Sequence, residues 1–494
     1  MVTSCQSPVA DAFCSLPIYL SRHRRDLSRH RRDRQIKTRP MNWATTFHRL
    51  LATGFFLFTF HLSPFTSTVW AGPFDDFGVG SRDAAMGGAY TAIADDFSGA
   101  YYNPGALSLI KESSFGFGFT YTHPRLYLNS QESRIENVTG TPFGFIVPLR
   151  GIFKEKAAIG FSGFMLGSLI YDVAMPPLNQ PDFALDRHRL RQQILMFAAS
   201  AQIFPFLSVG AGAQVQASIP SSVSMYLDAP FLLSGQPTPG APPSGYDFGV
   251  DVAYIITPTA GLLIKFSPRF KIGFTFRDSL DMRIKLKSSE IASGLSASPQ
   301  TLDIMVASHI LYTPRQYVLG TAVDILPDLT AAFDLIRTDW SGFPNPSAHI
   351  SLSSPDPVLN QVLPSVPPPP DPNFSDTLSQ RFGIEYRLNL IPKIKTAIRA
   401  GYGWSPSPIP DQTGESNFLD SDRHTFSGGL GIAFPAPWSL VAKPIEANFH
   451  LRYQLLAKRR VVKLGTVPAD NPGQPGYTID GDIFSGGLSL NLSF

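Results

Sequence analysis

The feature that most constrains this chain is the strict alternation of apolar and polar residues in many separate segments. The final stretch, LSLNLSF (488–494), has leucine or phenylalanine at every second position, with serine or asparagine between them. The same period of two runs through IEANFHLRYQL (445–455), QRFGIEYRLNL (380–390) and KTAIRAGYGW (395–404). A period of two is typical of β-strands with one apolar and one polar face. The chain is therefore predicted to be all-β.

Two all-β architectures fit this pattern: a sandwich with a shared apolar core, and a membrane barrel with its apolar face toward lipid. We place fourteen strands at about 114–123, 142–150, 156–170, 191–203, 207–219, 251–266, 270–288, 302–325, 329–340, 378–390, 395–405, 422–435, 443–460 and 481–494. The connections between them alternate between long and short, as in barrels with long extracellular loops and short periplasmic turns. We therefore predict a 14-stranded antiparallel transmembrane β-barrel over residues 114–494, in the outer membrane of a Gram-negative bacterium.

The residues before the barrel divide into three predicted parts. Residues 1–40 form a basic leader with nine Lys or Arg and three Asp. This run is short and has no basic module behind it, so nucleic acid is not a predicted partner. Residues 41–71 have the layout of a secretory signal peptide, with Met41 as the expected start, an apolar run and a small-residue site at Ala71. An uncleaved anchor helix is the alternative. Both cysteines precede Met41, so no disulfide framework is predicted.

The alternation continues to the last residue, Phe494, which a barrel explains. An open strand edge is not tolerated in lipid, so the last strand must pair with the first. Bacterial barrels commonly end in a strand with a terminal aromatic residue that the barrel-assembly machinery recognises. Phe494 is therefore the predicted assembly signal, and we expect a monomer surrounded by outer-membrane lipid and lipopolysaccharide.

Residues 72–113 do not alternate and are rich in Gly, Ala and Asp. The segment is long enough to lie inside the barrel, which would otherwise hold an aqueous channel. We therefore predict that residues 72–113 form an N-terminal hatch.

At this segment the chain resembles the FadL-like outer-membrane transporters of long-chain fatty acids and other hydrophobic compounds, aromatic hydrocarbons included. The residues that carry the resemblance are Gly78-Val79-Gly80, Met86-Gly87-Gly88-Ala89, Ala92–Asp96 and Asn103-Pro104-Gly105, the last at the place of the family's Asn-Pro-Ala motif. Downstream, TPRQYVLG (313–320) and the group Ser405, Pro406, Pro408, Asp420, Asp422 and Arg423 match as well. The resemblance covers essentially all of residues 72–494.

The resemblance implies passive uptake of a hydrophobic small molecule. In that mechanism the ligand lands on an extracellular groove, moves to a pocket beside the hatch, and leaves sideways at an inward kink in the third strand. If Ile159, Phe161 and Met165 of that strand face lipid, then Gly160, Ser162, Phe164, Leu166 and Ser168 face the lumen. Phe164 and Leu166 would then line the pocket or pack against the hatch, and both alternatives stay open. Gly160 and Gly163 would ease a kink.

Other residues have a structural and a functional interpretation. Met86, Asn103, Pro104 and Gly105 would take part in gating, although Asn103-Pro104 also suits a simple turn. Asp95 and Asp96 are expected to cap a turn or pair with an arginine, rather than act as acid and base. His450 and Arg452 would steer a carboxylate or, as we favour, pair with Glu446. Asp420, Asp422 and Arg423 are expected to be structural.

The alternative to uptake is that this FadL-like barrel acts as a shuttle or attachment protein of a secretion system. An enzyme is not predicted, since the sequence has no Gly-x-Ser-x-Gly, no clear nucleophile–base arrangement and no metal-ligand cluster. Accordingly, no cofactor and no metal are expected. A general porin is disfavoured if the hatch fills the lumen.

Overall fold

The fold was determined as a computed structural model. It describes residues 78–494 apart from 134, 154, 168–180, 184, 187–193, 218–221, 228–243, 250–253, 293–299, 348, 364, 366, 392–393, 413–415, 437–443, 464–472 and 474. The predicted leader and signal peptide lie outside the described residues.

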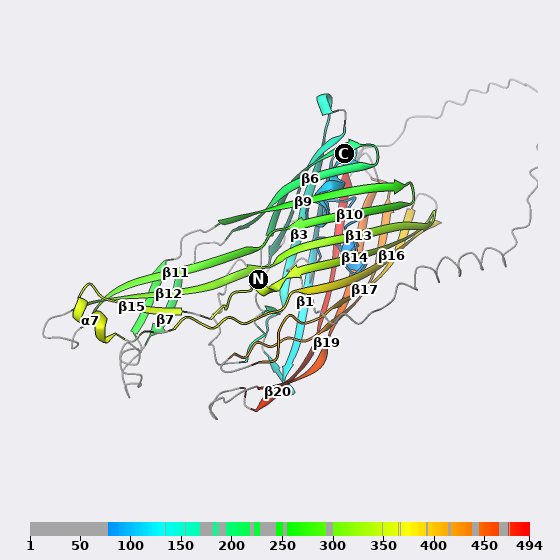
Figure 1. Cartoon of the computed structure of the whole chain (residues 1–494). Helices are drawn as coiled ribbons and strands as arrows, with labels where there is room; N and C mark the ends of the chain where they lie inside the picture. Colours follow the sequence, from blue (N-terminus) through cyan, green and yellow to red (C-terminus); the bar gives the residue numbers. More distant parts are fainter. Residues whose placement is uncertain are drawn as a thin grey trace, which may run out of the picture. The chain divides into compact units, whose positions relative to one another are not determined.

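Fourteen antiparallel strands form a closed barrel, as predicted from the alternation (Figure 1). They are β1 (Ser114–Leu128), β3 (Val138–Leu149), β4 (Ala157–Leu166), β5 (Ile194–Phe204), β6 (Leu207–Ala217), β9 (Tyr254–Ser267), β10 (Phe270–Arg277), β13 (Arg315–Leu326), β14 (Leu329–Asp339), β16 (Thr377–Ile391), β17 (Ile394–Ser405), β18 (Arg423–Phe434), β19 (Ile445–Val462) and β20 (Gly476–Ser493). Each strand pairs with its neighbour along the barrel, and β1 pairs with both β3 and β20, which closes the ring. A short strand, β2 (Gln131–Ser133), pairs with the end of β1.

The barrel is closed by β1 and β20, and their pairing continues to the last residues of β20. β1 and β20 pair in continuous register from Ser114 opposite Ser493 to Leu128 opposite Ile479. The amide of Phe494 donates to the Ser113 carbonyl at 2.8 Å. The recognition of Phe494 by the assembly machinery stays a prediction.

The alternation separates an apolar outside from a polar inside. In β1 the exposed side chains are Phe115, Phe117, Phe119 and Tyr121, while residues 116, 118, 120 and 122 are buried. The same pattern leaves aromatic and aliphatic side chains exposed on the outer face of the other strands, as at Phe382, Ile384 and Tyr386 of β16. An apolar outer band around a closed barrel is the construction of an outer-membrane protein.

Within the described residues, the helices lack the length and the hydropathy that a membrane-crossing helix requires.

The prediction is wrong for two strands, because each of them is interrupted and forms two separate strands in the structure. The predicted seventh strand is β10 followed by β11 (Leu280–Ala292), and the eighth is β12 (Gln300–Thr313) followed by β13. The first break lies at Asp278, whose side chain accepts from the Ser279 amide at 2.8 Å. The second lies at Pro314, which has no amide hydrogen to donate. The period of two survives both breaks, so the alternation gave no sign of them.

The outer halves of these strands form a separate sheet. β11, β12 and β15 (His349–Ser353) make three antiparallel strands, followed by α7 (Pro357–Val362), and β7 (Ser222–Leu227) pairs with β8 (Ser244–Gly249). In Figure 1, β11 and β12 continue beyond the ends of β10 and β13. Two single-turn 3-10 helices, η2 (Gly151–Phe153) and η3 (Trp340–Gly342), follow β3 and β14.

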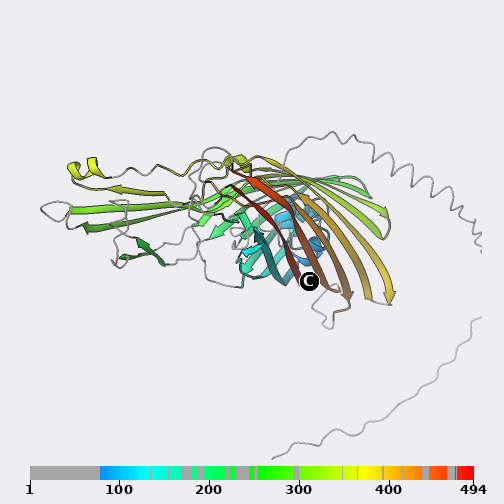
Figure 2. The same cartoon turned by 90° about the horizontal axis from the view of Figure 1, so that it is seen from below.

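The residues before β1 fold inside the barrel. They form α3 (Ser81–Ala85), α4 (Gly99–Tyr102) and η1 (Pro104–Leu109), and Figure 2 shows them, in blue, within the ring of strands. Nearly all of residues 78–108 are buried. We call residues 78–113 the N-terminal segment.

Candidate functional site

The N-terminal segment is seated on a belt of glycines. A Cβ atom added to any glycine of the belt would lie within 3.0 Å of an atom of the segment. The belt consists of Gly116 (β1), Gly144 (β3), Gly160 (β4), Gly210 (β6), Gly261 (β9), Gly273 (β10), Gly320 (β13), Gly383 (β16), Gly401 (β17) and Gly429 (β18). Ten of the fourteen strands thus approach the segment where they carry no side chain. The belt lets the backbone and the side chains of the segment lie closer to the strands than a larger residue would permit.

The Asn103-Pro104-Gly105 motif lies against the belt glycines Gly210, Gly261 and Gly273. The Asn103 amide nitrogen donates to the carbonyls of Thr91 and Leu262, both at 2.9 Å, and its oxygen accepts from the Gly105 amide at 2.9 Å. A Cβ on Gly105 would lie 2.8 Å from the Leu262 Cα atom. The glycine in the third place of the motif is therefore explained by the closeness of β9.

Strands outside the belt hold the segment with hydrogen bonds. On β5, the Ser200 hydroxyl donates to the Gly105 carbonyl at 3.0 Å. On β14, one carboxylate oxygen of Asp334 accepts from the consecutive amides of Tyr90 and Thr91, both at 3.0 Å. The segment is therefore fixed to opposite walls of the barrel.

One side of the segment is apolar. Its cluster with the wall includes Phe97, Leu107, Ile146, Phe164, Ile194 and Met196. Phe164 of β4 is 2% exposed, and its ring lies over Gly140 of β3. Since Ile159 and Met165 are exposed, Phe164 faces the lumen as predicted. The Ser162 hydroxyl, on the same face, donates to the Phe97 carbonyl at 2.5 Å.

The third strand is predicted to kink inward. This strand pairs with β3 without a register shift from Ala157 to Leu166. Gly160 belongs to the belt and contacts Leu107, whereas a Cβ on Gly163 would meet the Phe143 ring at 2.9 Å. The side chain of Leu166 and the whole of Ser168 lie outside the described part of the structure. The kink stays a prediction.

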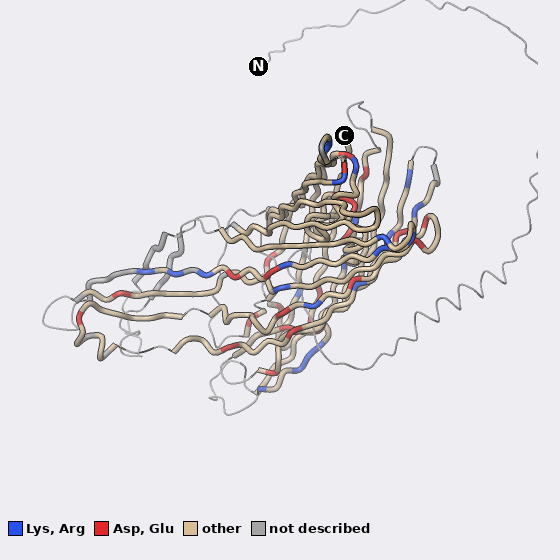
Figure 3. Tube along the Cα trace, turned by 45° about the horizontal axis from the view of Figure 1, so that its top comes forward, with Lys and Arg blue, Asp and Glu red and all other residues tan. Residues whose placement is uncertain are grey.

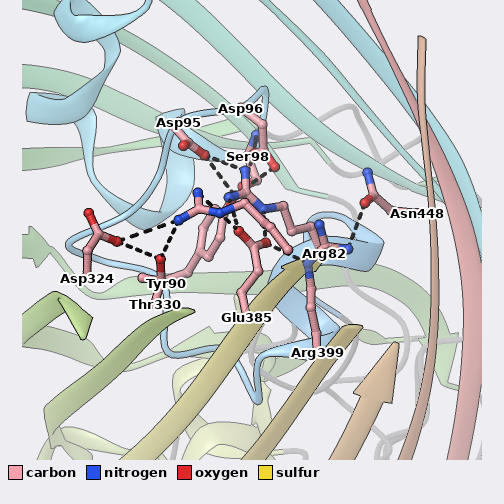
Figure 4. Close-up of polar contacts among 11 residues, drawn as sticks. Arg82, Tyr90, Asp95, Asp96, Ser98, Asp324, Thr330, Glu385, Arg399 and Asn448 are labelled. Atoms are coloured by element: carbon pink, nitrogen blue, oxygen red, sulfur yellow. Dashed lines mark hydrogen bonds and ion pairs between the residues drawn. The ribbon is translucent and has the colours of Figure 1, made fainter. Parts of the chain in front are cut away.

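The opposite side of the segment is charged (Figure 4). Arg82 of α3 pairs with Asp95 at 2.6 Å and with Glu385 of β16 at 2.9 Å. Glu385 also pairs with Arg399 of β17 at 2.7 Å, and Arg399 donates to the Asn448 side chain at 2.8 Å. The side chains of Glu385 and Arg399 are only 4% and 5% exposed. This network, the Arg82–Glu385–Arg399 network, ties the segment to β16, β17 and β19.

A cavity of about 370 Å³ lies beside this network, at the short-turn end of the barrel. Its charged lining residues are Arg82, Arg387, Lys395, Arg399, Asp95, Asp328, Glu385 and Glu446. Four cations thus face four carboxylates. The lining is polar and charge-balanced, so the cavity suits water and not a hydrocarbon.

The remaining predicted residues are in structural roles, with one correction. Asp96 accepts from the Ser98 amide at 3.0 Å and caps that turn, while Asp95 pairs with Arg82, as expected. The ring nitrogens of His450 have no hydrogen-bond partner within the described part of the chain, so its expected pairing with Glu446 is wrong. Glu446 lies at the cavity instead, one lumen position of β19 before Asn448.

The Asp-x-Asp-Arg group ties loops to strands, as expected. Asp420 and Asp422 both accept hydrogen bonds from Ser407, at 2.8 and 2.9 Å. Arg423 is buried and pairs with Asp186 at 2.5 Å. Met86 of the N-terminal segment is fully buried, with its carbonyl against Gly383.

The sequence reasoning missed the residues that fix the segment. Glu385 directly follows the lipid-facing Ile384, and Arg399 directly follows the lipid-facing Ile398. In a strand with a period of two, this position predicts that both charges face the lumen. Arg82, which pairs with the same carboxylate of Glu385 as Arg399 does, lies 303 residues away from Glu385 in the chain. The glycines of the belt had no period that distinguished them from other glycines.

Comparison with known proteins supports the fold. No family model matches the chain. The chain is 22% identical over 435 residues to alkane uptake protein A of Marinobacter nauticus, covering 84% of this chain and 90% of that protein. In structure it is similar to a Pseudomonas aeruginosa FadL homologue, with a TM-score of 0.52, 17% identity and coverage of 86% and 98%. It is also similar to the CymD monoaromatic hydrocarbon channel, with a TM-score of 0.53, 17% identity and coverage of 84% and 98%. The resemblance to FadL-like proteins is thus confirmed at the level of the fold.

Proposed function

We propose that this FadL-like barrel of the outer membrane takes up hydrophobic small molecules passively, either long-chain fatty acids or hydrocarbons, and releases them sideways into the membrane. Residues 72–113 act as its hatch. The observation that carries the proposal is the seating of the N-terminal segment: it lies across the lumen, it is bonded to several strands of the wall, and it makes its largest apolar contacts with β3, β4 and β5.

The fixed hatch argues against passage straight through the lumen. Such passage would separate the backbone contacts at the glycine belt and break the hydrogen bonds to Asp334 and the Arg82–Glu385–Arg399 network. A hydrophobic molecule also gains nothing from the polar cavity below, because transfer of apolar surface into water is unfavourable. Release into lipid requires no such transfer.

The apolar side indicates where the ligand passes. Phe164 and Leu166 line the route on β4, and Met86, Asn103, Pro104 and Gly105 keep the hatch in place beside it. Gly160 and Gly163 keep this strand free of large side chains near the predicted exit. The likeness to an alkane uptake protein and to a monoaromatic hydrocarbon channel supports an apolar ligand.

The test is uptake of radiolabelled hexadecane and of oleate by cells that produce the protein. Phe164→Ser places a hydroxyl in the proposed route, and we expect it to reduce hexadecane uptake by about tenfold. The matched control is Ile336→Ser, since Ile336 of β14 is an equally buried side chain on another wall. Equal loss in both variants, or none in either, would contradict the route; uptake of neither ligand by the wild type would contradict the function.

A further inference from the structure

A buried cation without a counter-ion faces the lumen on β10. Arg277, the last residue of this strand, is 5% exposed. Among the described residues, no carboxylate lies within ion-pair distance of its guanidinium group. The barrel strands β3, β4, β5, β6, β9 and β10 carry no Asp or Glu, so no red lies along them in Figure 3. Burial of an unpaired charge is costly, so this arginine requires an anion from elsewhere.

Arg277 borders the apolar side of the N-terminal segment. It shares its face of β10 with Gly273 of the glycine belt and lies two lumen positions farther from the short turn. Its Nη1 atom donates to the Tyr101 carbonyl at 2.9 Å, and its guanidinium carbon lies 4.2 Å from the centre of the Tyr101 ring. Tyr101 belongs to the same apolar cluster as Phe164. The cation therefore lies next to a surface that suits an apolar chain.

The guanidinium group of Arg277 has donors left for a further partner. Its Nε and Nη2 atoms both donate to the Gln316 side-chain oxygen, at 3.0 and 2.8 Å. A guanidinium group has five N–H hydrogens, and these two bonds together with the bond to Tyr101 use three of them. The two that remain lie one on each terminal nitrogen, and a carboxylate can accept from both.

A second donor beside Arg277 also has no partner. Arg277 pairs with Thr259 of β9, which makes Thr257 its diagonal neighbour on the lumen face, about 7–8 Å away between Cα atoms. Within the described part of the chain, the Thr257 hydroxyl makes no hydrogen bond, and neither does the side-chain nitrogen of Gln214, which lies opposite Thr257 on β6. Both side chains are buried. Buried donors without partners are costly, and an oxygen-bearing ligand would satisfy them.

We propose that Arg277 and Thr257 bind the carboxylate of a long-chain fatty acid, with the tail of the ligand along the apolar side of the N-terminal segment. This inference rests on the proposed function and decides between its two ligand classes. The carboxylate supplies the charge that Arg277 lacks and accepts from the Thr257 hydroxyl. A hydrocarbon has no group for either role, so the site favours fatty acids.

The experiment is a competition between oleate and methyl oleate for the detergent-solubilised full chain, followed by native mass spectrometry. The two ligands share their tail and differ at the carboxylate. We expect the wild type to prefer oleate by about tenfold or more, because the ester cannot replace a charged acceptor. Arg277→Met keeps the apolar stem of the side chain and removes the cation, so it should abolish this preference.

Two further variants separate binding from folding. Thr257→Val removes a hydroxyl without a partner, so it should leave the barrel at least as stable and yet lower the oleate preference by about threefold. The matched control is Thr275→Val, since the Thr275 hydroxyl on the same face of β10 donates to the Tyr102 carbonyl at 2.7 Å and carries no charge. Thr275→Val should keep the oleate preference of the wild type.

Acetate distinguishes a fatty-acid site from a site for small anions. It has the carboxylate without the tail, so acetate at the concentration of oleate should not displace it. Displacement by acetate would overturn the assignment to fatty acids. An oleate preference that is the same in the wild type and in Arg277→Met would overturn the site itself. If Arg277→Met does not fold, an unchanged preference in Thr257→Val overturns it.

Uptake by cells distinguishes failure of this inference from failure of the proposed function. Cells with Arg277→Met should take up hexadecane at the wild-type rate and oleate at about a tenth of the wild-type rate or less. Wild-type cells that take up hexadecane but not oleate would contradict the carboxylate site and leave the transporter in place. Wild-type cells that take up neither would contradict the function.

Discussion

At the scale of the residue, the absence of a side chain decides how closely the N-terminal segment, the proposed hatch, approaches the wall. A Cβ on Gly401 would lie 2.1 Å from the Gly87 amide nitrogen. We expect Gly401→Ala to lower the free energy of unfolding by about 1–3 kcal/mol, because the backbone of the hatch has to move away. Thermal unfolding in detergent and protease cleavage within residues 78–113 measure this.

The control for Gly401 lies on the adjacent strand. A Cβ on Gly428 would come no closer than 3.7 Å to any atom that it meets. Gly428→Ala should therefore leave the barrel as stable as before, or slightly more stable, since glycine weakens a strand. An equal loss of stability at both positions would show that the belt has no special role.

Burial also decides which ion pairs matter. Glu385 faces both Arg82 and Arg399 at under 3.0 Å. Glu385→Gln would remove this carboxylate from the buried Arg399 and leave Arg82 with Asp95 alone. We expect a loss of about 3–5 kcal/mol in unfolding free energy, together with larger ion conductance as the hatch loosens. Thermal unfolding and single-channel recording check the two effects.

The control for Glu385→Gln is a substitution in a solvent-exposed ion pair. The Arg337 side chain is 60% exposed and pairs with Asp376 at 3.2 Å. Arg337→Gln should cost less than about 1 kcal/mol, because solvent screens such pairs. If Arg337→Gln costs as much as Glu385→Gln, burial is not what makes the network strong.

At the scale of the element, the outer sheet depends on an aromatic cluster that titrates. Tyr312 of β12 packs edge-on against Phe343, which stacks on Phe374 at 4.6 Å. Burial, assisted by the nearby Asp281, raises the pKa of Tyr312 from its ordinary value to about 12. The neutral phenol is thus favoured in the folded state, so its stabilising effect is complete below pH 10 and is lost as the pH rises toward 12.

This pH dependence can be measured at the cluster itself. We expect the fluorescence of Trp340, which contacts Phe343, to change between about pH 10 and 12 as the cluster loosens. In Tyr312→Phe that component of the change should disappear. A transition of the same size in the variant would assign it to another tyrosine.

At the scale of the whole molecule, the question is whether the hatch moves during uptake. The described residues contain no cysteine, so an engineered disulfide is unambiguous. A Cβ on Gly383 would lie 2.9 Å from that of Met86, about 0.6 Å short of the usual minimum for a disulfide. The same Cβ would lie 2.6 Å from the Met86 carbonyl oxygen, so the backbone at residue 86 has to move away from β16 before Met86→Cys and Gly383→Cys can crosslink the N-terminal segment to this strand.

We expect the crosslinked protein to take up hexadecane at the rate of the reduced form, because release occurs at the wall beside a hatch that stays in place. The reduced form of the same variant is the control. Uptake that stops on oxidation and returns on reduction would mean that the hatch has to open, and that the ligand leaves through the lumen.

The sequence by itself determined the barrel, since a period of two fixes which residues face lipid, and closure in lipid requires an even set of fully paired strands. It therefore predicted the fourteen strands and the inward direction of Phe164. Only the tertiary structure decided which residues that are far apart in the chain contact one another. Arg82 meets Glu385, and Gly87 meets Gly401, because closing the barrel brings distant strands around one segment. No local period records such proximity, so the glycine belt, the charged network and the breaks at Asp278 and Pro314 became visible only in the folded chain.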